Sequence, residues 1–403
     1  MKTDLAAFES FAAAARDVRR ALHRRPELSG AEALTRDVIV AELAALGFDA
    51  QTFEGGLGVT ALWPAREGGD GPCVALRADM DALPLREESG VPWASEHEGV
   101  MHACGHDGHM AILLGVARWL ATSGTRFSGP VKLIFQPAEE TGLGAPFMIR
   151  AGVLRNPDVK AVFALHGWPE LPAGTLSIPD RAVMAAVDNF DVTLKGTGGH
   201  GAMPHLVRDP VPAAATLISA AQTLVSRRAS PLDAAVLTFG HVAAGRTYNV
   251  VPATCLLRGT LRTLDPALRK MLRTEFEALV RHAAEAHGVA ADIVWVEACP
   301  ATINDPAMAA LARAGVSAAL GAGALRDAPP SMGGEDFSYF LQEIPGAYFW
   351  LGLGMERGGL HNPRFDFNDE AIATGIAAFA GIVEQFFSDL TNQNLKSEIR
   401  NHK

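Results

Sequence analysis

The sequence is poor in cysteine, in clustered basic residues and in long apolar runs, and each shortage argues against a class of protein. Four cysteines are scattered along 403 residues, which is not the pattern of a disulfide framework. The net charge is -10 and no dense Lys/Arg run occurs, so nucleic acid is not an expected partner, because phosphate binding needs clustered cations. No stretch reaches the roughly 18 apolar residues of a membrane span, so no membrane partner is expected.

The composition is that of a well-packed globular protein. Hydrophobic residues make up 48% of the chain and charged residues 20%, which argues against a disordered chain. The length suits two domains better than one. The alanine-rich segment 5–15 resembles the core of a signal peptide, but Asp4 and Glu9 break its apolar character. We therefore expect a cytoplasmic protein.

The first part of the chain alternates between helical and strand patterns. Helices are expected at about 4–25, 31–46 and 109–123. Apolar runs predict buried strands at 59–63, 73–79, 131–136 and 161–166. This alternation indicates an α/β fold with a mainly parallel sheet. In such sheets, ligands gather at the carboxyl ends of the strands.

Segment 188–298 has a different rhythm, and its strands and helices follow each other in the order β-α-β-β-α-β. This is the order of a ferredoxin-like domain. The α/β rhythm then resumes with a helix near 306–319, a strand at 346–352 and a final helix from Glu370. The sequence therefore predicts a discontinuous domain, 1–187 and 299–403, into which the domain 188–298 is inserted.

The strongest chemical signal is HACGHDGH at 102–109, immediately before a helix. Thiolate and imidazole are good ligands for transition metals, and the glycine-containing turn lets several of these side chains converge on one point. A polar helix cap with an incidental cysteine is the alternative. The density of ligand types within eight residues favours a metal site.

Further candidates follow predicted strands. FQPAEET at 135–141 ends a strand with Glu139 and Glu140; one can bind a metal while its neighbour accepts a proton from a metal-activated water. His166 ends the next strand, and Asp81 in RADMDALPL can orient a ligating imidazole. Each feature alone is compatible with a solvated loop or a hydrogen-bonded boundary residue.

Two histidines lie farther along the chain. LHNP at 360–363 contains His361 near a turn, and the glycine-rich GTGGHGAMPH at 196–205 presents His200. His200 falls in the inserted domain, apart from the other candidates.

In content and order, these motifs resemble one family, the dinuclear metal aminoacylases that include hippurate hydrolases and indole-acetyl-amino-acid hydrolases. The resemblance covers almost the whole chain, from HRRPELSGAE at 23–32 through MGGEDFSYF at 332–340 to LHNPRFDFND at 360–369. It implies a catalytic domain of metallo-aminopeptidase type and an inserted domain that serves as a lid and in dimerisation.

The resemblance also implies residue roles. Five residues look like the ligands of two divalent cations: Cys104, His106, Glu140, His166 and His361. Glu139 looks like the general base, and Asp81 like the residue that orients a ligand. His200 is similar to a histidine that, in dimeric relatives, reaches the partner's site and stabilises the oxyanion. Asn249 in YNVVPA looks like a substrate-binding residue.

The chain departs from the wider superfamily at two places. Most members carry His-x-Asp where this chain has Asp79-Met80-Asp81, and a bridging Asp where it has Cys104 and His106. The ligand that bridges the two ions is therefore open. Manganese and zinc are both expected candidates and cobalt is a third, because ligand affinity alone does not decide which metal is loaded.

The expected function is hydrolysis of N-acyl amino acids such as hippurate by a metal-activated water, with Glu139 as general base, in a homodimer or larger homo-oligomer. Alternatives with the same chemistry are a dipeptidase, an N-acetyl-diaminopimelate deacetylase and an aminobenzoyl-glutamate hydrolase. A more remote alternative is a binding protein without turnover, which would be expected to lack the base or a ligand.

Overall fold

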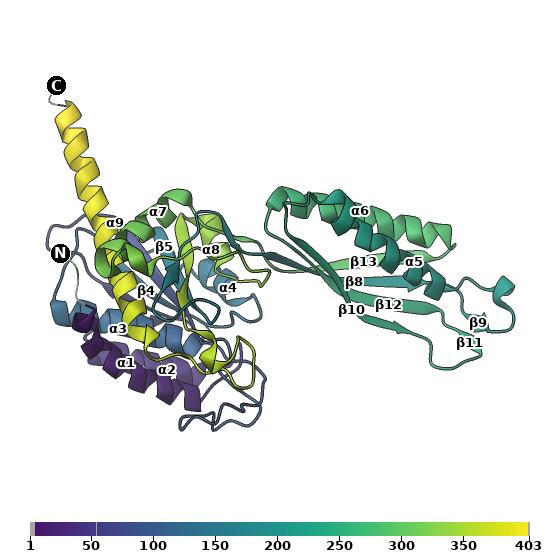
Figure 1. Cartoon of the computed structure of the whole chain (residues 1–403), viewed down its shortest axis with the longest axis horizontal. Helices are drawn as coiled ribbons and strands as arrows, with labels where there is room; N and C mark the ends of the chain where they lie inside the picture. Colours follow the sequence, from purple (N-terminus) through teal and green to yellow (C-terminus); the bar gives the residue numbers. More distant parts are fainter. Residues whose placement is uncertain (1–4, 54, 402–403) are drawn as a thin grey trace. The chain divides into compact units, whose positions relative to one another are not determined.

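The computed structural model describes residues 5–53 and 55–401 and divides the chain into two compact units (Figure 1). Unit 2 consists of Ala182–Thr302 and Pro330–Glu335, and unit 1 of the remaining described residues. The stretch Pro330–Glu335 was expected in the first domain. It belongs to unit 2 because its backbone pairs there: Ser331 donates to the Val183 carbonyl over 2.9 Å, and Ala185 donates to the Gly333 carbonyl over 2.9 Å.

Unit 1 is built on a seven-stranded sheet. The strands, in spatial order, are β1 (Ala50–Thr52), β2 (Val59–Trp63), β4 (Val131–Gln136), β3 (Cys73–Asp79), β5 (Val159–Trp168), β15 (Gly346–Gly352) and β6 (Leu176–Ser177). The four middle strands, from β4 to β15, are parallel, whereas β1, β2 and β6 pair antiparallel. The sheet is therefore mixed rather than mainly parallel. Strand β2 cannot run parallel to β3, because a parallel crossover needs about a dozen residues or more and only 64–72 connect the two.

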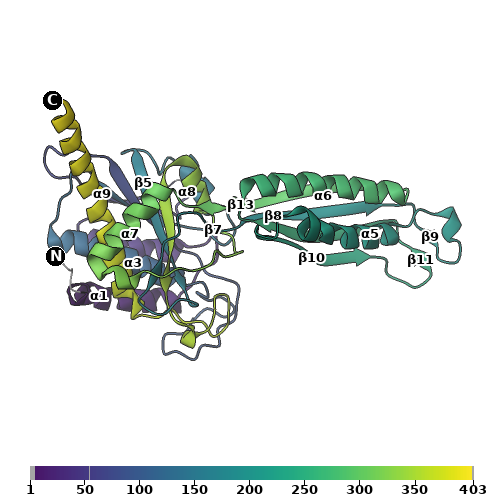
Figure 2. The ribbon, with the colours of Figure 1, turned by 45° about the horizontal axis from the view of Figure 1, so that its top comes forward.

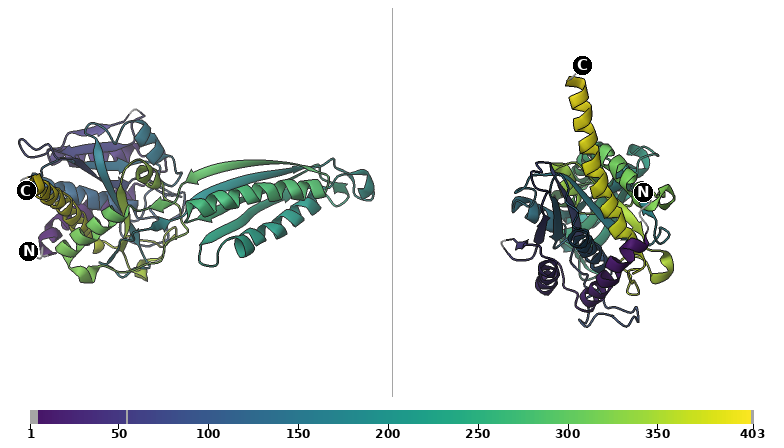
Figure 3. Two further views of the ribbon diagram at one scale, coloured as in Figure 1. Left: turned by 90° about the horizontal axis from the view of Figure 1, so that it is seen from above. Right: turned by 90° about the vertical axis from the view of Figure 1, so that its left-hand side faces the viewer.

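The helices of unit 1 pack around this sheet. They are α1 (Ala6–Arg24), α2 (Ala33–Ala45), α3 (His106–Ser123), α4 (Gly144–Arg150), α7 (Pro306–Leu320), α8 (Ser338–Glu343) and α9 (Ala371–Asn401). Helices α1, α3 and α9, the last of them yellow in Figure 3, pack against one another. The stretch Ala371–Asp389 of α9 is long and apolar enough to cross a membrane, but most of it is buried inside the unit, as in the core helix of a globular protein.

Helix α3 begins three residues earlier than the apolar pattern predicted, at His106 instead of His109. Gly105 precedes it in the left-handed region, with φ 91°, which a residue with a Cβ adopts only with strain. The early start puts His106 and His109 on the first turn of the helix, above the sheet's carboxyl edge.

Unit 2 has a four-stranded antiparallel sheet in the order β10 (Ala235–Ala244), β12 (Thr254–Thr263), β8 (Ala186–Lys195) and β13 (Ala290–Cys299). Helices α5 (Pro210–Thr223) and α6 (Pro266–Ala286) cover one face of it (Figure 2). Both helices begin with an Asp-Pro pair whose aspartate caps the first turn. Strands and helices follow each other in the predicted order.

The remaining elements of the described residues are short strands and single helical turns. They are β7 (Ala182–Met184), β9 (Gly199–His200), β11 (Val250–Val251), β14 (Thr302–Ile303), the single turns Pro204–Leu206, Ala322–Ala324 and Met355–Arg357, and a π-helical turn, Leu224–Arg228. The four cysteines are all buried and none of them forms a disulfide.

Candidate metal centre

The thiol of Cys104, just before α3, lies at the centre of the candidate site in unit 1. Its Sγ is 3.3 Å from Nε2 of His166, near the end of β5, and 3.3 Å from Nε2 of His361, in the loop after β15. Three segments far apart in the sequence therefore bring ligand-type atoms together. Parallel strands explain the meeting, because their carboxyl ends share one edge of the sheet.

The remaining predicted site residues of unit 1 surround this thiol. Oε1 of Glu140 lies 3.4 Å from Nε2 of His361. The ligand atoms of three overlapping groups lie within 4.8 Å of one another: Cys104 with His106 and His166, Cys104 with Glu140 and His361, and His106 with Glu139 and Glu140. The structure thus places all five predicted ligands and the predicted base in one cluster.

Two non-glycine residues of this region have left-handed backbone conformations. Ala138, directly before the glutamate pair, has φ 55°, and His361 has φ 59°. Such conformations cost about 1–3 kcal/mol each and persist where the surroundings hold them. The backbone amide of His361 is held by the Ala103 carbonyl over 2.8 Å.

Hydrogen bonds fix which ring nitrogen of two histidines faces the cluster. Nδ1 of His106 donates to the backbone carbonyl of Asp81 over 2.8 Å and lies 3.3 Å from the Asp81 carboxylate. Nδ1 of His166 donates to the Gly167 carbonyl over 2.8 Å. Both rings therefore turn Nε2 toward the cluster, the arrangement that outer partners impose on metal-binding imidazoles.

Burial and neighbouring charges shift the titration of these groups. Burial, reinforced by the carboxylates of Glu140 and Glu139, raises the pKa of the Cys104 thiol well above its usual value. Burial alone would lower the pKa of His106, but Asp79 and Asp81 outweigh it and raise that pKa to about 10. Burial and the neighbouring His109 lower the pKa of His166. The carboxylates beside Cys104 and His106 therefore favour a bound cation.

The donor set fits a divalent metal. Nε2 of His106 and Oε1 of Glu140 are buried without a hydrogen-bond partner among the described residues, although buried polar atoms are normally paired. Sulfur, imidazole nitrogen and carboxylate oxygen at such mutual distances are typical ligands of zinc and related ions. A metal held there would satisfy both orphaned atoms.

Sequence reasoning gave no role to His109, the last residue of HACGHDGH. Its Nδ1 donates to Asp79 over 2.6 Å, and its Nε2 accepts the backbone N–H of Gly167 over 2.8 Å. Arg77 holds the other oxygen of Asp79 over 2.7 Å. His109 therefore ties the helix to the strand end that carries His166. Its spacing from His106 was the available signal, because residues i and i+3 share a helix face.

His200 and Asn249 lie together in unit 2, and the other predicted site residues lie in unit 1. His200 on β9 pairs with Val250 on β11, and Gly201 donates to the Asn249 carbonyl over 2.7 Å. Both side chains are exposed. Nδ1 of His200 accepts the Ala202 N–H over 3.0 Å, which in the neutral ring leaves the proton on Nε2.

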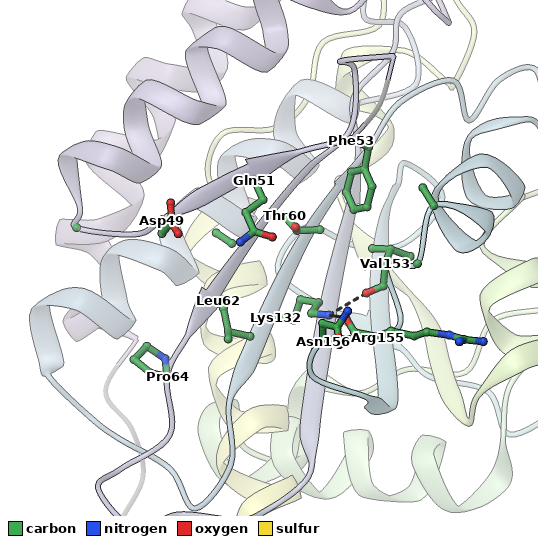
Figure 4. Close-up of a pocket in the computed structure, with 14 residues that line it drawn as sticks. Asp49, Gln51, Phe53, Thr60, Leu62, Pro64, Lys132, Val153, Arg155 and Asn156 are labelled. Atoms are coloured by element: carbon green, nitrogen blue, oxygen red, sulfur yellow. Dashed lines mark hydrogen bonds between the residues drawn. The ribbon is translucent and has the colours of Figure 1, made fainter.

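A separate pocket of about 480 Å³ opens at the other side of unit 1, beside β1 and β2 (Figure 4). None of the predicted site residues lines it. Its most buried charge, the Lys132 ammonium, is already used, because it donates to the carbonyls of Val153, Arg155 and Pro157 over 2.9, 2.7 and 3.2 Å. Lys132 therefore stabilises the loop after α4, and its ammonium group is not available as a catalytic group.

Comparison with known proteins identifies the relatives of the chain. The model of peptidase family M20/M25/M40 matches residues 75–385. N-acetyl-L-cysteine deacetylase of Bacillus subtilis is 40% identical, over 88% of this chain and 84% of that one. IAA-amino acid hydrolase ILR1-like 2 of Arabidopsis thaliana is 36% identical, over 92% of this chain and 85% of that one.

A solved structure shares the fold. The Bacillus subtilis protein YXEP, described as a dinuclear metal-binding peptidase of the M20 family, superposes with a TM-score of 0.82 at 34% identity, over 93% of this chain and 98% of that one.

Proposed function

The chain belongs to peptidase family M20/M25/M40, and on that premise we propose that it hydrolyses N-acyl amino acids of the hippurate type. As a member with amide-cleaving relatives, it is a metal-dependent amidohydrolase. One observation carries the proposal: a thiol, imidazoles and carboxylates converge at one edge of the sheet, and two of their buried ligand atoms have no hydrogen-bond partner among the described residues.

Five residues would hold two divalent ions, with manganese, zinc and cobalt as the candidates: Cys104, His106, Glu140, His166 and His361. Their atoms form overlapping groups that share Cys104 or His106, which supports two neighbouring ions. Bound cations would supply Lewis acidity and lower the pKa of a coordinated water from 15.7 toward roughly 7.

The chain's own groups would then move the proton and bind the substrate. Glu139, next to ligand Glu140 in the turn after β4, accepts a proton from the attacking water and delivers it to the departing amine nitrogen. Asp81 orients His106 through the hydrogen bond and close contact at Nδ1. Two carboxylates and one thiolate only partly neutralise two dications, so the site attracts the carboxylate of an amino acid.

The proposal extends to unit 2, whose strand order supports a ferredoxin-like domain; the family resemblance implies that this domain serves as a lid and in dimerisation. His200 carries a proton on Nε2 in its neutral form, as an oxyanion donor must, and removing such a donor typically lowers the rate about a hundred- to a thousandfold. Asn249, which directly precedes β11 and whose carbonyl accepts the N–H of Gly201 next to His200, would bind the substrate. By family resemblance, His200 would act in the partner's site of a homodimer.

A second candidate is deacetylation of N-acetyl amino acids. Relatives named N-acetyl-L-cysteine deacetylase and N-acetyldiaminopimelate deacetylase support it, at 40% and 36% identity. A dipeptidase and an aminobenzoyl-glutamate hydrolase have the same chemistry and differ only in the groups that flank the amide.

A substrate panel on metal-reconstituted protein separates these functions. Hippurate, N-acetylcysteine, N-acetyl-diaminopimelate, aminobenzoyl-glutamate and a dipeptide are compared by kcat/KM. The proposal expects the highest value for an aromatic acyl group, and a preference for acetyl groups favours the second candidate. The matched control is Glu139→Gln, which should keep its metal and lose turnover, whereas Glu140→Gln should lose both. Absence of hydrolysis with every acyl amino acid would refute the proposal.

The role of His200 is tested by mixing two inactive variants. When Glu139→Ala and His200→Ala chains are refolded together, donation across the dimer gives each mixed dimer one complete site, so activity returns. Donation within one chain leaves every site incomplete. Persistent inactivity in demonstrably mixed dimers rules out the cross-subunit role, and full activity of His200→Ala alone removes the histidine from the mechanism.

A further inference from the structure

The turn between α1 and α2 contains polar side chains that the proposed mechanism does not use. It is the end of the motif HRRPELSGAE and includes Glu27, Ser29 and Glu32. The segment runs beside the chain just after β3: Leu28 bridges Ala82 in parallel, and Ala82 donates to the Glu27 carbonyl over 2.8 Å. This pairing brings the turn next to Asp81, which precedes Ala82.

Ser29 contacts the candidate site through Asp81. Its Oγ donates to Oδ2 of Asp81 over 2.6 Å, and the same oxygen accepts the backbone N–H of Glu140 over 3.0 Å. Asp81 is thus bound at Oδ2 by the turn and by the glutamate loop, while its Oδ1 lies 3.3 Å from Nδ1 of His106. Burial opposes ionisation of Asp81, but the hydrogen bonds from His106 and Ser29 lower its pKa and keep it charged.

Glu32 contacts the glutamate loop directly. Its side chain is fully buried, and Oε1 accepts the backbone N–H of Ala138 over 2.8 Å. Ala138 is the residue with φ 55°, and it immediately precedes Glu139 and Glu140. A left-handed alanine is held only if its surroundings oppose relaxation, and Glu32 supplies a fixed acceptor at its amide.

The other side of this loop is closed by its own hydrogen bonds. The Ala138 carbonyl accepts from Thr141 Oγ1 over 3.1 Å and from Gly144 N over 3.2 Å, and Gly142 donates to the Glu139 carbonyl over 2.7 Å. These bonds define a compact turn, but none of them fixes how the turn is oriented against the sheet. The orientation of the turn is fixed by the contacts from Glu32 to Ala138 and from Asp81 to Glu140.

We propose that Glu32 and Ser29 are positioning residues that set the orientation of the Glu139–Glu140 turn, so that one carboxylate faces the metals and the other the water. The inference rests on the proposed function, because it assumes that these two glutamates are base and ligand. It gives the motif HRRPELSGAE a role: the turn after α1 supports the Glu139–Glu140 turn through the backbone amide of Ala138 and through Asp81, which Ser29 and Glu140 both contact.

The test uses full-length protein and four variants, Glu32→Ala, Glu32→Gln, Ser29→Ala and Glu27→Ala. Glu27 is the matched control, because its Oε2 also accepts a backbone N–H, that of Thr35 over 2.8 Å, but in α2 instead of the catalytic loop. Zinc affinity is measured by equilibrium dialysis, kcat and KM on metal-saturated protein, and stability by urea unfolding.

Glu32→Ala should weaken zinc binding and lower kcat by about 10- to 100-fold, as loss of an outer partner of a metal site does, while KM changes by less than about threefold. Glu32→Gln keeps an oxygen acceptor and should recover most of both losses. Ser29→Ala, which removes only a hydroxyl, should weaken zinc binding in the same direction by a smaller factor. Glu27→Ala should lower stability and leave zinc affinity and kcat unchanged.

Zinc affinity and kcat of Glu32→Ala equal to wild type, or losses of the same size in Glu27→Ala, would overturn the inference. If Glu32→Ala does not fold, Glu32→Gln and Ser29→Ala decide, and wild-type zinc affinity and kcat in Ser29→Ala count against it. Failure of the proposed function is distinguishable, because then wild-type protein itself binds no metal or cleaves no amide.

Discussion

His106 and Asp107, consecutive buried residues at the start of α3, belong to two different clusters of charged and polar groups in unit 1. One is the donor cluster, made of Cys104, His106, Glu140, His166 and His361. The other is the arginine cluster, made of Arg19, His23, Asp107, Asp366 and Asp369. Both lie next to the same helix turn, and they balance their charges in different ways.

The arginine cluster contains its own cation. Arg19, fully buried in α1, pairs with Asp107 over 2.7 Å, with Asp366 over 2.5 Å and with Asp369 over 3.3 Å. Burial opposes the charge of Arg19, but the three carboxylates raise its pKa, and Arg19 and His23 lower the pKa of Asp107 despite burial. These contacts join α1, the start of α3 and the segment after His361.

The donor cluster contains no arginine or lysine among its members. The atoms within reach of Cys104 Sγ are imidazole nitrogens and carboxylate oxygens, which suits a metal ion as the balancing charge. The comparison teaches that burial of polar atoms is not by itself a sign of function. A cluster whose charges are paired internally needs no ligand and is damaged when one partner is removed, whereas a cluster that leaves ligand atoms without hydrogen-bond partners suits an ion from solution.

Metal removal should give the largest effect and act on the donor cluster alone. A strong chelator should lower activity by roughly a thousandfold or more, because the attacking water loses its activation, and manganese, zinc or cobalt should restore it. Elemental analysis should find about two ions per chain in the active protein. Cys104→Ser should lose metal, since a hydroxyl is a far poorer ligand than a thiolate. An active preparation without transition metal would contradict the assignment.

The contrast also shows which parts the sequence could predict. The members of the donor cluster could be named because ligand-type residues lie in recognisable motifs, some at strand ends such as Glu140 and His166, and because the family resemblance implies the complete set. The arginine cluster could not, because Arg19 and Asp369 are ordinary surface-type residues 350 positions apart and nothing local marks them as partners. Sequence periodicity reports which face of a helix is apolar, not which charge meets which.

The same distinction between local sequence patterns and long-range contacts applies to the fold. Apolar runs gave the strands β2 to β5 and the helices of unit 2, since burial produces periodic patterns. The antiparallel direction of β2, which makes the sheet mixed instead of mainly parallel, and the backbone pairing of Pro330–Glu335 with unit 2 both depend on tertiary contacts that no local pattern reports. Helix α5 ends at Thr223 and continues as a π-helical turn at Leu224–Arg228, a local change that has no sequence pattern of its own.

Replacing the internal cation should be the strongest way to damage the arginine cluster. Arg19→Met leaves Asp107 and Asp366 buried without their partner and should lower the free energy of unfolding by about 3–5 kcal/mol, as measured by urea denaturation. The metal content per folded chain should stay unchanged. Arg20→Met is the matched control, because the neighbouring Arg20 pairs with Asp369 but is one-third exposed, and it should cost about 1 kcal/mol or less. Equal losses of unfolding free energy in both variants would show that the buried Arg19 contributes no more to stability than the partly exposed Arg20.

A pH titration probes the cluster without removing its arginine. Burial lowers the pKa of His23, but Asp107 and Glu87 outweigh it and raise that pKa to about 9, against 6.5 in the unfolded chain. The folded state then holds a proton that the unfolded state releases, so this contribution is complete below pH 6.5 and is lost as pH rises through 9. Wild type should lose up to about 3 kcal/mol more than His23→Gln over that interval. Parallel stability curves for the two proteins would show that His23 carries no such proton.

The smallest effect is expected from an ion pair on helix α3, the helix that contributes to both clusters, at a position that is partly exposed to water. Arg118 of α3 lies 3.2 Å from Glu42 of α2, and each side chain is 32% exposed. Arg118→Ala should change the free energy of unfolding by about 0–1 kcal/mol, because the ions keep much of their hydration, and the difference should shrink when the ionic strength is raised from about 0.01 to 1 M. Metal content and kcat should not change. A loss comparable to that of Arg19→Met would mean that contact with α3, and not burial away from water, determines how much these ion pairs stabilise the fold.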